Sequence, residues 1–280
     1  MNIYIAKNSG FCFGVKRALK KTLEAVKQEE NKIFTFGPLI HNTQVINRLN
    51  SLGVKSTDKI EDAEDSTLII RSHGIPLKIY DDADEKNVEI IDLTCPFVRR
   101  VQEIAKEYHN KGYKIVIIGN PKHPEVIGIN GWCNNSAYII EEIAEVEKLP
   151  FIPKMCVVAQ TTITFEKWNT IIKELDKKAD EIREFNTICL ATKERQEASA
   201  EIAKKVDAMI VIGGYHSSNT QKLFKVSKSY CDNSIHIETA EELPLEIFEG
   251  CKDVGITAGA STPDWIINEV VKKIENEGGD

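Results

Sequence analysis

The chain has 280 residues, of which 42% are hydrophobic and 28% are charged, and its formal net charge is −7. This composition is typical of a globular protein with a large buried core. The excess of acidic residues argues against a broad surface for nucleic acid. No stretch approaches the roughly 18 apolar residues of a membrane span, and no signal peptide is recognisable. We therefore expect a cytoplasmic protein that binds neither nucleic acid nor a membrane.

The expected elements alternate between strands and helices along the whole chain. The apolar runs predict strands at 3–6, 33–36, 68–70, 88–91, 113–118, 155–159, 208–212 and 254–257, and the repeating order of elements implies a further strand at 186–189. Helical periodicity predicts helices from 16 to about 30 and at 43–52, 98–109, 192–205 and 265–274. The charge-rich residues 141–148 are interpreted as a solvated helix face. Alternation of this kind predicts an α/β fold with parallel sheets and right-handed crossovers.

Seven cysteines are spread along the chain, at positions 12, 95, 133, 156, 189, 231 and 251. In a reducing compartment, special cysteines are more often metal ligands or catalytic groups than disulfide partners. No two of them form a Cys-x-x-Cys pair, so neither a zinc knuckle nor a thioredoxin-type site is indicated.

The same order of elements occurs three times, and each time it starts from a cysteine that follows a strand and precedes a helix. These cysteines are Cys12, Cys95 and Cys189. A first polar loop lies 29, 28 and 28 residues later, at His41, His123 and Ser217. A second lies 61, 66 and 72 residues later, at His73, Thr161 and Ser261. The repeat predicts three small parallel-sheet α/β lobes at 13–94, 95–188 and 189–280, with strand 1–12 completing the third.

Loops that follow parallel strands emerge at one edge of a sheet, where α/β proteins bind their ligands. A pseudo-threefold, trefoil-like packing of the lobes would therefore bring three thiolates to a common centre. Three thiolates suit a 4Fe-4S cluster with one open iron better than structural zinc, which takes four protein ligands. The polar loops are rich in donors, and several precede helix N-termini, which favour phosphate. Glu125 is the one carboxylate in these loops and a reasonable proton donor.

Simpler interpretations exist for each of these residues. The three repeat cysteines could be buried core thiols. Core or incidental roles are the favoured interpretation of Cys133, Cys156, Cys231 and Cys251. The loop histidines could serve only as caps or turn residues. Helix capping is likewise the commoner use of serine and asparagine at such positions.

Nine short motifs follow one another across nearly the whole chain. They are Gly10–Val15, His41–Asn42, Ser72–Gly74, Asp92–Pro96, His123–Glu125, Gln160–Thr162, Ile188–Ala198, Ser217–Asn219 and Thr257–Ser261. With these motifs the chain closely resembles the LytB-type 4-hydroxy-3-methylbut-2-enyl diphosphate reductases, a family of trilobed iron–sulfur enzymes. The resemblance implies the last step of the non-mevalonate isoprenoid pathway. In that step, a two-electron reductive dehydroxylation forms isopentenyl and dimethylallyl diphosphate.

The resemblance also implies roles for individual residues. Cys12, Cys95 and Cys189 would hold the 4Fe-4S cluster, and Glu125 would supply protons, with Thr161 and His123 ordering the groups around it. The diphosphate would be bound by His41, His73, His123, Thr161, Ser217, Ser218, Asn219 and Ser261. Electrons would come from a separate ferredoxin- or flavodoxin-like protein, because no flavin or nicotinamide site is recognisable.

Two other classes of function stay open. One is a different three-cysteine 4Fe-4S enzyme, such as a dehydratase or a quinolinate-synthase-like enzyme. A requirement for external electrons separates a reductase from these. The other is a non-enzymatic iron–sulfur sensor or electron carrier, which would not need so many polar side chains near its cluster.

Overall fold

The computed structural model describes residues 1–28 and 31–277, and the chain divides into two compact units. Unit 1 comprises Met1–Lys16, Ile40–Arg48 and Leu190–Asp280. Unit 2 comprises Arg17–Leu39 and Leu49–Cys189. Two predicted positions lie outside the described residues: the end of the first helix at about residue 30, and the end of the third lobe at residue 280.

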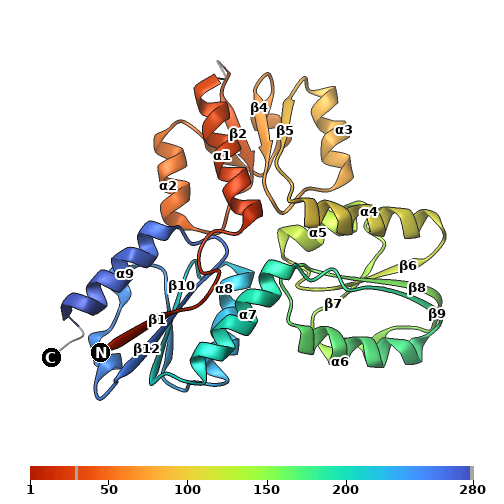
Figure 1. Ribbon diagram of the computed structural model, residues 1–280. Helices are drawn as coiled ribbons and strands as arrows, with labels where there is room; N and C mark the ends of the chain where they lie inside the picture. Colours follow the sequence, from red (N-terminus) through yellow and green to blue (C-terminus); the bar gives the residue numbers. More distant parts are fainter. Residues whose placement is uncertain (29–30, 278–280) are drawn as a thin grey trace. The chain divides into compact units, whose positions relative to one another are not determined.

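The described residues form three sheets, each of four parallel strands (Figure 1). The sheet of unit 1 has the order β1 (Asn2–Ile5), β12 (Asp253–Ala258), β10 (Ala208–Ile212) and β11 (Ser234–Ile237). One sheet of unit 2 has the order β3 (Lys55–Thr57), β2 (Ile33–Phe36), β4 (Thr67–Ile70) and β5 (Glu89–Asp92). The other has the order β7 (Tyr138–Ile140), β6 (Lys114–Ile118), β8 (Ile152–Ala159) and β9 (Ala179–Phe185). The predicted α/β fold with parallel sheets is confirmed.

The three sheets share one strand order. The edge strands β5 and β9 each follow the third strand of their sheet, and they lead to Cys95 and Cys189. In unit 1 the equivalent edge position is taken by β1, which pairs with β12 in the register Ile3 to Val254 and leads to Cys12. The N-terminal strand thus belongs to the sheet formed by the last third of the chain. The lobe boundaries at residues 94 and 188 stay predictions.

Nine α-helices connect and cover these strands within the described ranges. They are α1 (Phe13–Gln28), α2 (Thr43–Ser51), α3 (Leu77–Glu85), α4 (Pro96–Asn110), α5 (Pro124–Gly131), α6 (Phe165–Leu175), α7 (Leu190–Ala203), α8 (Ser218–Lys228) and α9 (Asp264–Glu277). Short 3₁₀ helices lie at Ile60–Ala63, Ile143–Lys148, Asp176–Lys178, Ala240–Glu242 and Leu245–Phe248. Of the helices so described, none is both long and apolar enough to cross a membrane.

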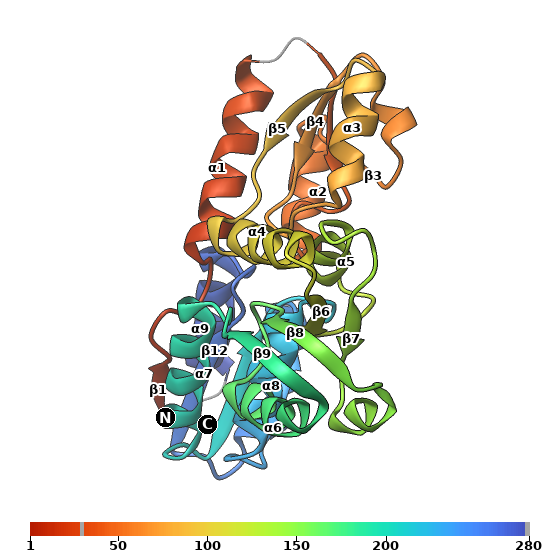
Figure 2. The ribbon, with the colours of Figure 1, turned by 90° about the vertical axis from the view of Figure 1, so that its right-hand side faces the viewer.

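The central strands are apolar on both faces because helices cover both faces of the sheet. Along β6, Ile115 and Ile117 pack with residues of α4 and α5, whereas Val116 packs on the opposite face with α6 residues such as Trp168. Figure 2 shows α4 and α5 on one side of β6, β8 and β9, and α6 on the other. Each fully buried aliphatic side chain of this kind contributes roughly 1.5–3 kcal/mol to stability.

Two predicted elements are wrong in detail. Residues 186–189 form no strand; the edge strand is β9, whose charged sequence has the alternation of a half-exposed strand rather than a long apolar run. Polar contacts shape the turn that follows, because the Thr187 hydroxyl donates to the Ala159 carbonyl at 2.6 Å. The charged segment 141–148 contains the 3₁₀ helix Ile143–Lys148 instead of an α-helix, and the Glu145 carboxylate caps its start.

Candidate functional site

Each of the three repeat cysteines lies in a turn between an edge strand and the start of a helix. Cys12 immediately precedes α1, Cys95 is the N-cap residue of α4, and Cys189 immediately precedes α7. None of the three forms a disulfide within the described part of the chain, and all three are half-buried. The predicted equivalence of these positions is therefore present in the local structure.

The backbone extends this equivalence. The N–H of each repeat cysteine donates to a carbonyl in the second polar loop of the preceding repeat, which for Cys12 is the last repeat of the chain. The pairs are Cys12 to Ala260 at 3.1 Å, Cys95 to Ser72 at 3.0 Å, and Cys189 to Thr161 at 3.0 Å. Each acceptor is a predicted polar site residue or the residue directly before one. The cysteine turn and the polar loop are thus held together within each sheet.

The other cysteines have different surroundings. Cys133, Cys156 and Cys231 are buried in the core, as expected from their sequence context. Burial raises the pKa of the Cys133 thiol to about 11 and that of Cys156 to about 12. These thiols stay neutral at physiological pH, and a neutral thiol is a poor metal ligand.

Glu125 and Thr161 form a buried pair in unit 2. Glu125 is only 1% exposed and lies in the first turn of α5, while Thr161 follows β8. The Glu125 carboxylate accepts the Thr161 N–H at 2.6 Å and the Thr161 hydroxyl at 2.9 Å. This double contact orients the carboxyl group and connects it to a hydroxyl that can pass on a proton.

Two histidines of unit 2, His73 and His123, lie beside each other in space, and His123 precedes Glu125 by two residues in the sequence. The rings of His73 and His123 have centroids 5.4 Å apart and are nearly perpendicular. His123 caps α5, because its Nδ1 accepts the N–H of Glu125 at 3.2 Å. In a neutral ring with an accepting Nδ1, the proton is on Nε2, which is then a hydrogen-bond donor.

In unit 1, three polar loops meet at the start of α8. Ser217 is the N-cap residue of this helix. The Ser261 hydroxyl lies 3.2 Å from the His41 carbonyl oxygen and 3.5 Å from the Ser217 hydroxyl. A helix N-terminus surrounded by hydroxyl groups is a common arrangement for phosphate binding.

Asn219 gives this group an unusual feature. It is 5% exposed, yet neither its amide nitrogen nor its amide oxygen has a hydrogen-bond partner among the described residues. Such a buried unsatisfied amide costs free energy unless a ligand or water completes it. Ser218, the first residue of α8, accepts from the Lys222 ammonium at 2.8 Å, which adds a positive charge to this helix end.

The predicted residues fall into two groups within the units. His41, Ser217, Ser218, Asn219, Ser261 and Cys12 belong to unit 1. His73, His123, Glu125, Thr161, Cys95 and Cys189 belong to unit 2. Within each unit, the contacts described above join several members of the group.

Sequence reasoning missed three supporting residues. Lys222 was overlooked because it lies one turn inside a helix rather than in a polar loop. Gln160 is fully buried and its side-chain oxygen accepts the Asn120 N–H at 3.0 Å, which links the two polar loops of its repeat. Arg195 of α7 is buried and donates to the Gly10 carbonyl at 2.9 Å, beside the Cys12 turn. Gln160 and Arg195 lie within motifs named above. The motifs therefore marked these two positions but did not indicate what their side chains do.

Known proteins resemble this chain over its whole length. A reductase named for 4-hydroxy-3-methylbut-2-enyl diphosphate from Clostridioides difficile is 51% identical over 279 residues, covering 99% of this chain and 100% of that protein. One of the same name from Alkaliphilus oremlandii is 49% identical over 278 residues, with 99% and 100% covered.

Two solved structures are also similar. One is an (E)-4-hydroxy-3-methyl-but-2-enyl diphosphate reductase, described as the terminal enzyme of the non-mevalonate pathway. It has a TM-score of 0.73 and 44% identity, with 99% of this chain and 100% of that chain covered. The other is the E-1-hydroxy-2-methyl-but-2-enyl-4-diphosphate reductase from Plasmodium falciparum, with a TM-score of 0.94 and 31% identity, covering 98% and 88%. The family model described as LytB protein matches residues 3–275, and the chain belongs to this family.

Proposed function

We propose that this protein is a 4-hydroxy-3-methylbut-2-enyl diphosphate reductase acting in the non-mevalonate isoprenoid pathway. It removes the allylic hydroxyl of its substrate with two electrons and two protons, and it releases water and isopentenyl or dimethylallyl diphosphate. The single observation that carries the proposal is the threefold recurrence of a half-buried cysteine turn bonded to a polar loop. Full-length similarity to reductases of this name supports it.

The proposed cofactor is a 4Fe-4S cluster held by Cys12, Cys95 and Cys189. The three cysteines suit this cluster because they are half-buried in equivalent turns. Cys133 and Cys156, in contrast, are kept neutral in the core. When bound, such a cluster supplies electrons and one iron without a protein ligand that acts as a Lewis acid. The chain would take its electrons from a ferredoxin- or flavodoxin-like protein, in the reducing cytoplasm that suits free thiols.

The proposed diphosphate site includes the N-terminal end of α8. The backbone N–H groups there favour an anion, and the Lys222 ammonium beside Ser218 adds a full positive charge. The buried amide of Asn219 would gain the partners it lacks within the described structure. Ser217, Ser218, Ser261 and His41 would add donors to the same anion, and His73, His123 and Thr161 are proposed as further ligands.

Glu125 is the proposed proton source. Its carboxyl group is almost fully buried, so it exchanges protons through its neighbours, and one of these is the Thr161 hydroxyl at 2.9 Å. Protonated, Glu125 donates toward Thr161, whose own hydroxyl proton can then move to the departing hydroxyl of the substrate. His123 orients this end of α5 through the bond from the Glu125 N–H to its Nδ1.

Anaerobic reconstitution with iron and sulfide tests the proposal. The wild-type chain should bind about four irons and consume the allylic diphosphate only when a reductant such as dithionite with a mediator is present. Mössbauer spectra should show one iron that changes when the substrate is added. Cys95→Ser should lose most of the cluster and the activity, whereas Cys251→Ser, a matched change at a half-buried cysteine outside the repeat, should keep both.

Two results would reject the proposal. Turnover without added reductant would indicate a dehydratase or another redox-neutral enzyme. Four equivalent irons, unchanged by the substrate and without turnover, would indicate a sensor or an electron carrier.

A further inference from the structure

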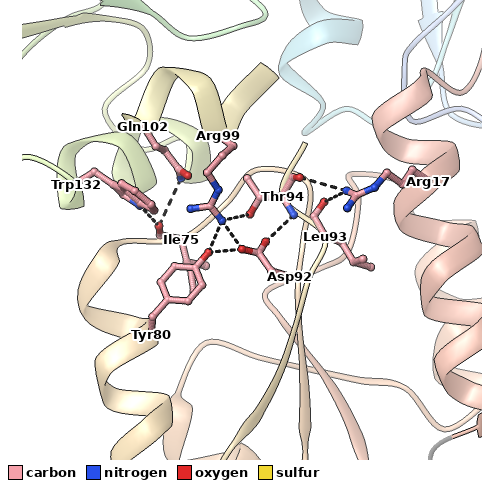
Figure 3. Close-up of polar contacts among 9 residues, drawn as sticks. All are labelled: Arg17, Ile75, Tyr80, Asp92, Leu93, Thr94, Arg99, Gln102 and Trp132. Carbon is pink, nitrogen blue, oxygen red and sulfur yellow. Dashed lines mark hydrogen bonds and ion pairs between the residues drawn. The ribbon is translucent and has the colours of Figure 1, made fainter. Parts of the chain in front are cut away.

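A group of polar and aromatic side chains in unit 2 centres on Arg99 of α4 (Figure 3). The Arg99 guanidinium pairs with the Asp92 carboxylate and donates to the Tyr80 hydroxyl at 2.7 Å. The ring of Trp132 lies against the same guanidinium, with its centroid 4.8 Å from Cζ. We call these four residues the Arg99 cluster. None of them is among the predicted site residues.

The Arg99 cluster holds the turn that carries Cys95. One Asp92 oxygen faces Arg99, while the other accepts the Thr94 N–H at 2.8 Å. The backbone N–H of Arg99 donates to the Cys95 carbonyl at 2.9 Å. On the other side of the turn, the Arg17 guanidinium of α1 lies 3.3 Å from the Thr94 carbonyl oxygen (Figure 3). Side-chain and backbone contacts from two helices therefore fix the residues directly before the thiol.

The same cluster also reaches the loop that carries His73. The indole Nε1 of Trp132 donates to the Ile75 carbonyl at 3.0 Å (Figure 3). Ile75 lies two residues after His73, and Ser72, on the other side of His73, accepts the Cys95 N–H at 3.0 Å. The loop around His73 is thus held at both ends, once by the Cys95 turn and once by Trp132.

Trp132 connects a third element, because it directly follows the last residue of α5. The first turn of α5 carries His123 and Glu125. The stacking of Trp132 on Arg99 therefore joins the C-terminal end of this helix to the Cys95 turn. Three segments with predicted site residues, distant in sequence, are thus linked through the Arg99 cluster.

A plain surface ion pair is the alternative explanation, and such pairs contribute little to stability. Several observations argue against it here. The Arg99 and Asp92 side chains are only 23% and 31% exposed, and the guanidinium has a carboxylate, a phenol and an aromatic face as partners. Helix α4 does not depend on Arg99, because Pro96 starts it and buried residues such as Val98 and Val101 attach it to the core.

We propose that Arg99 is a positioning residue, which sets the placement of Cys95 and His73 relative to α5 through Asp92 and Trp132. This inference rests on the proposed function, since it gives Cys95 and His73 the roles of cluster ligand and substrate ligand. It adds a residue that touches neither cluster nor substrate. A planar guanidinium is required, because an ammonium cannot pair with a carboxylate and stack on an indole in the same way.

Amide hydrogen exchange of the full-length chain tests this inference with and without the cluster. In Arg99→Met, the amides of residues 93–95 and 73–75 should exchange roughly tenfold faster, as expected for loss of a charge-assisted hydrogen bond. Arg99→Lys should be intermediate. Arg100→Met, the same change at the exposed neighbouring residue, should match wild type. In the reconstituted enzyme, Arg99→Met should also lose iron to a chelator faster and should lower kcat more than it raises KM.

Trp132→Phe provides a second variant, which keeps an aromatic ring but removes the Nε1–H donor. It should accelerate exchange at residues 73–75 and leave residues 93–95 near wild type. Unchanged exchange in both segments of Arg99→Met would overturn the inference. So would an equal acceleration across the whole chain, because that result would indicate general destabilisation.

The proposed function and the positioning role of Arg99 can fail separately. If the wild-type chain neither retains iron nor reduces the allylic diphosphate, the proposed function is wrong. The exchange measurements on the iron-free chain still decide whether Arg99 positions the two segments. If the wild type is an active reductase and Arg99→Met keeps normal exchange, iron retention and kinetics, only the role of Arg99 is wrong.

Discussion

A carboxyl group with 1% exposure, such as that of Glu125, keeps its orientation because its partners are fixed. Both of its oxygens accept from one residue, Thr161, through the N–H at 2.6 Å and the hydroxyl at 2.9 Å. Buried carboxyl groups held in this way are suited to deliver a proton at a defined place. At the scale of a single residue, the proposed proton transfer depends on individual atoms, so a substitution that replaces one atom tests it.

Glu125→Gln replaces one carboxyl oxygen with an amide nitrogen and leaves the side chain the same size. Because the amide cannot supply a proton, we expect reductase activity to fall by roughly 10²–10⁴-fold. Cluster content and the thermal midpoint should change little, since one oxygen remains to accept from Thr161. Steady-state kinetics with iron analysis measures this, and Glu103→Gln, at an exposed glutamate of α4, is the control. Activity close to wild type in Glu125→Gln would assign the proton to another group.

At the scale of single elements, helix α5 shows how closely the site segments pack. A Cβ added at Gly131 would lie 2.4 Å from the Pro76 Cβ and 2.7 Å from the Pro76 Cα. The end of α5 therefore touches the loop that follows His73, and only glycine allows that approach. At Gly128, on the same helix, the nearest atom would be Gln102 Nε2, at 3.3 Å.

The two glycines give a matched comparison. Gly131→Ala should lower the free energy of unfolding by about 1–3 kcal/mol, because the helix must move away from Pro76. Gly128→Ala should be near neutral, since alanine favours the helix by up to about 1 kcal/mol and the flexible Gln102 side chain can adjust. Urea denaturation measures both values. Equal effects at the two positions would show that the contact with Pro76 does not limit the packing of α5.

At the scale of the whole molecule, buried thiols link stability to pH. Burial raises the pKa of Cys133 to about 11 and that of Cys156 to about 12, above the value of about 8.5 for an exposed thiol. Since both folded pKa values lie above the unfolded value, the unfolded chain loses these protons first as the pH rises. The stabilising contribution is complete below about pH 8.5 and is lost progressively toward pH 11–12.

Cys156→Ala removes one of these thiols, so its stability should depend less steeply on pH. Between pH 9 and 10.5, the free energy of unfolding of the wild type should fall faster than that of Cys156→Ala by up to about 1.4 kcal/mol per pH unit. Urea denaturation at several pH values measures the two slopes. The difference in the free energy of unfolding between the two proteins at pH 7 gives the cost of the cavity that alanine leaves, which does not depend on pH. Parallel curves would mean that Cys156 does not contribute to this pH dependence.

Much of this molecule followed from local patterns in the chain. The apolar runs located the central strands, because strands buried on both faces need uninterrupted apolar residues. The cysteine turns and polar loops recurred at similar spacings, since each parallel strand ends at the same edge of its sheet. The charged strand β9 was missed because its place depends on pairing with β8, a contact that hydrophobicity alone does not encode.

Only the tertiary structure decided which residues far apart in the chain are in contact. Glu125 meets Thr161 across 36 residues, and Trp132 meets Ile75 across 57. The burial of Asn219 and the convergence on Arg99 likewise depend on how helices pack on sheets. Motif spacing predicted which residue types belong to the site, because these follow strand ends. Which atoms touch is set by side-chain packing over long sequence separations, and no local pattern specifies it.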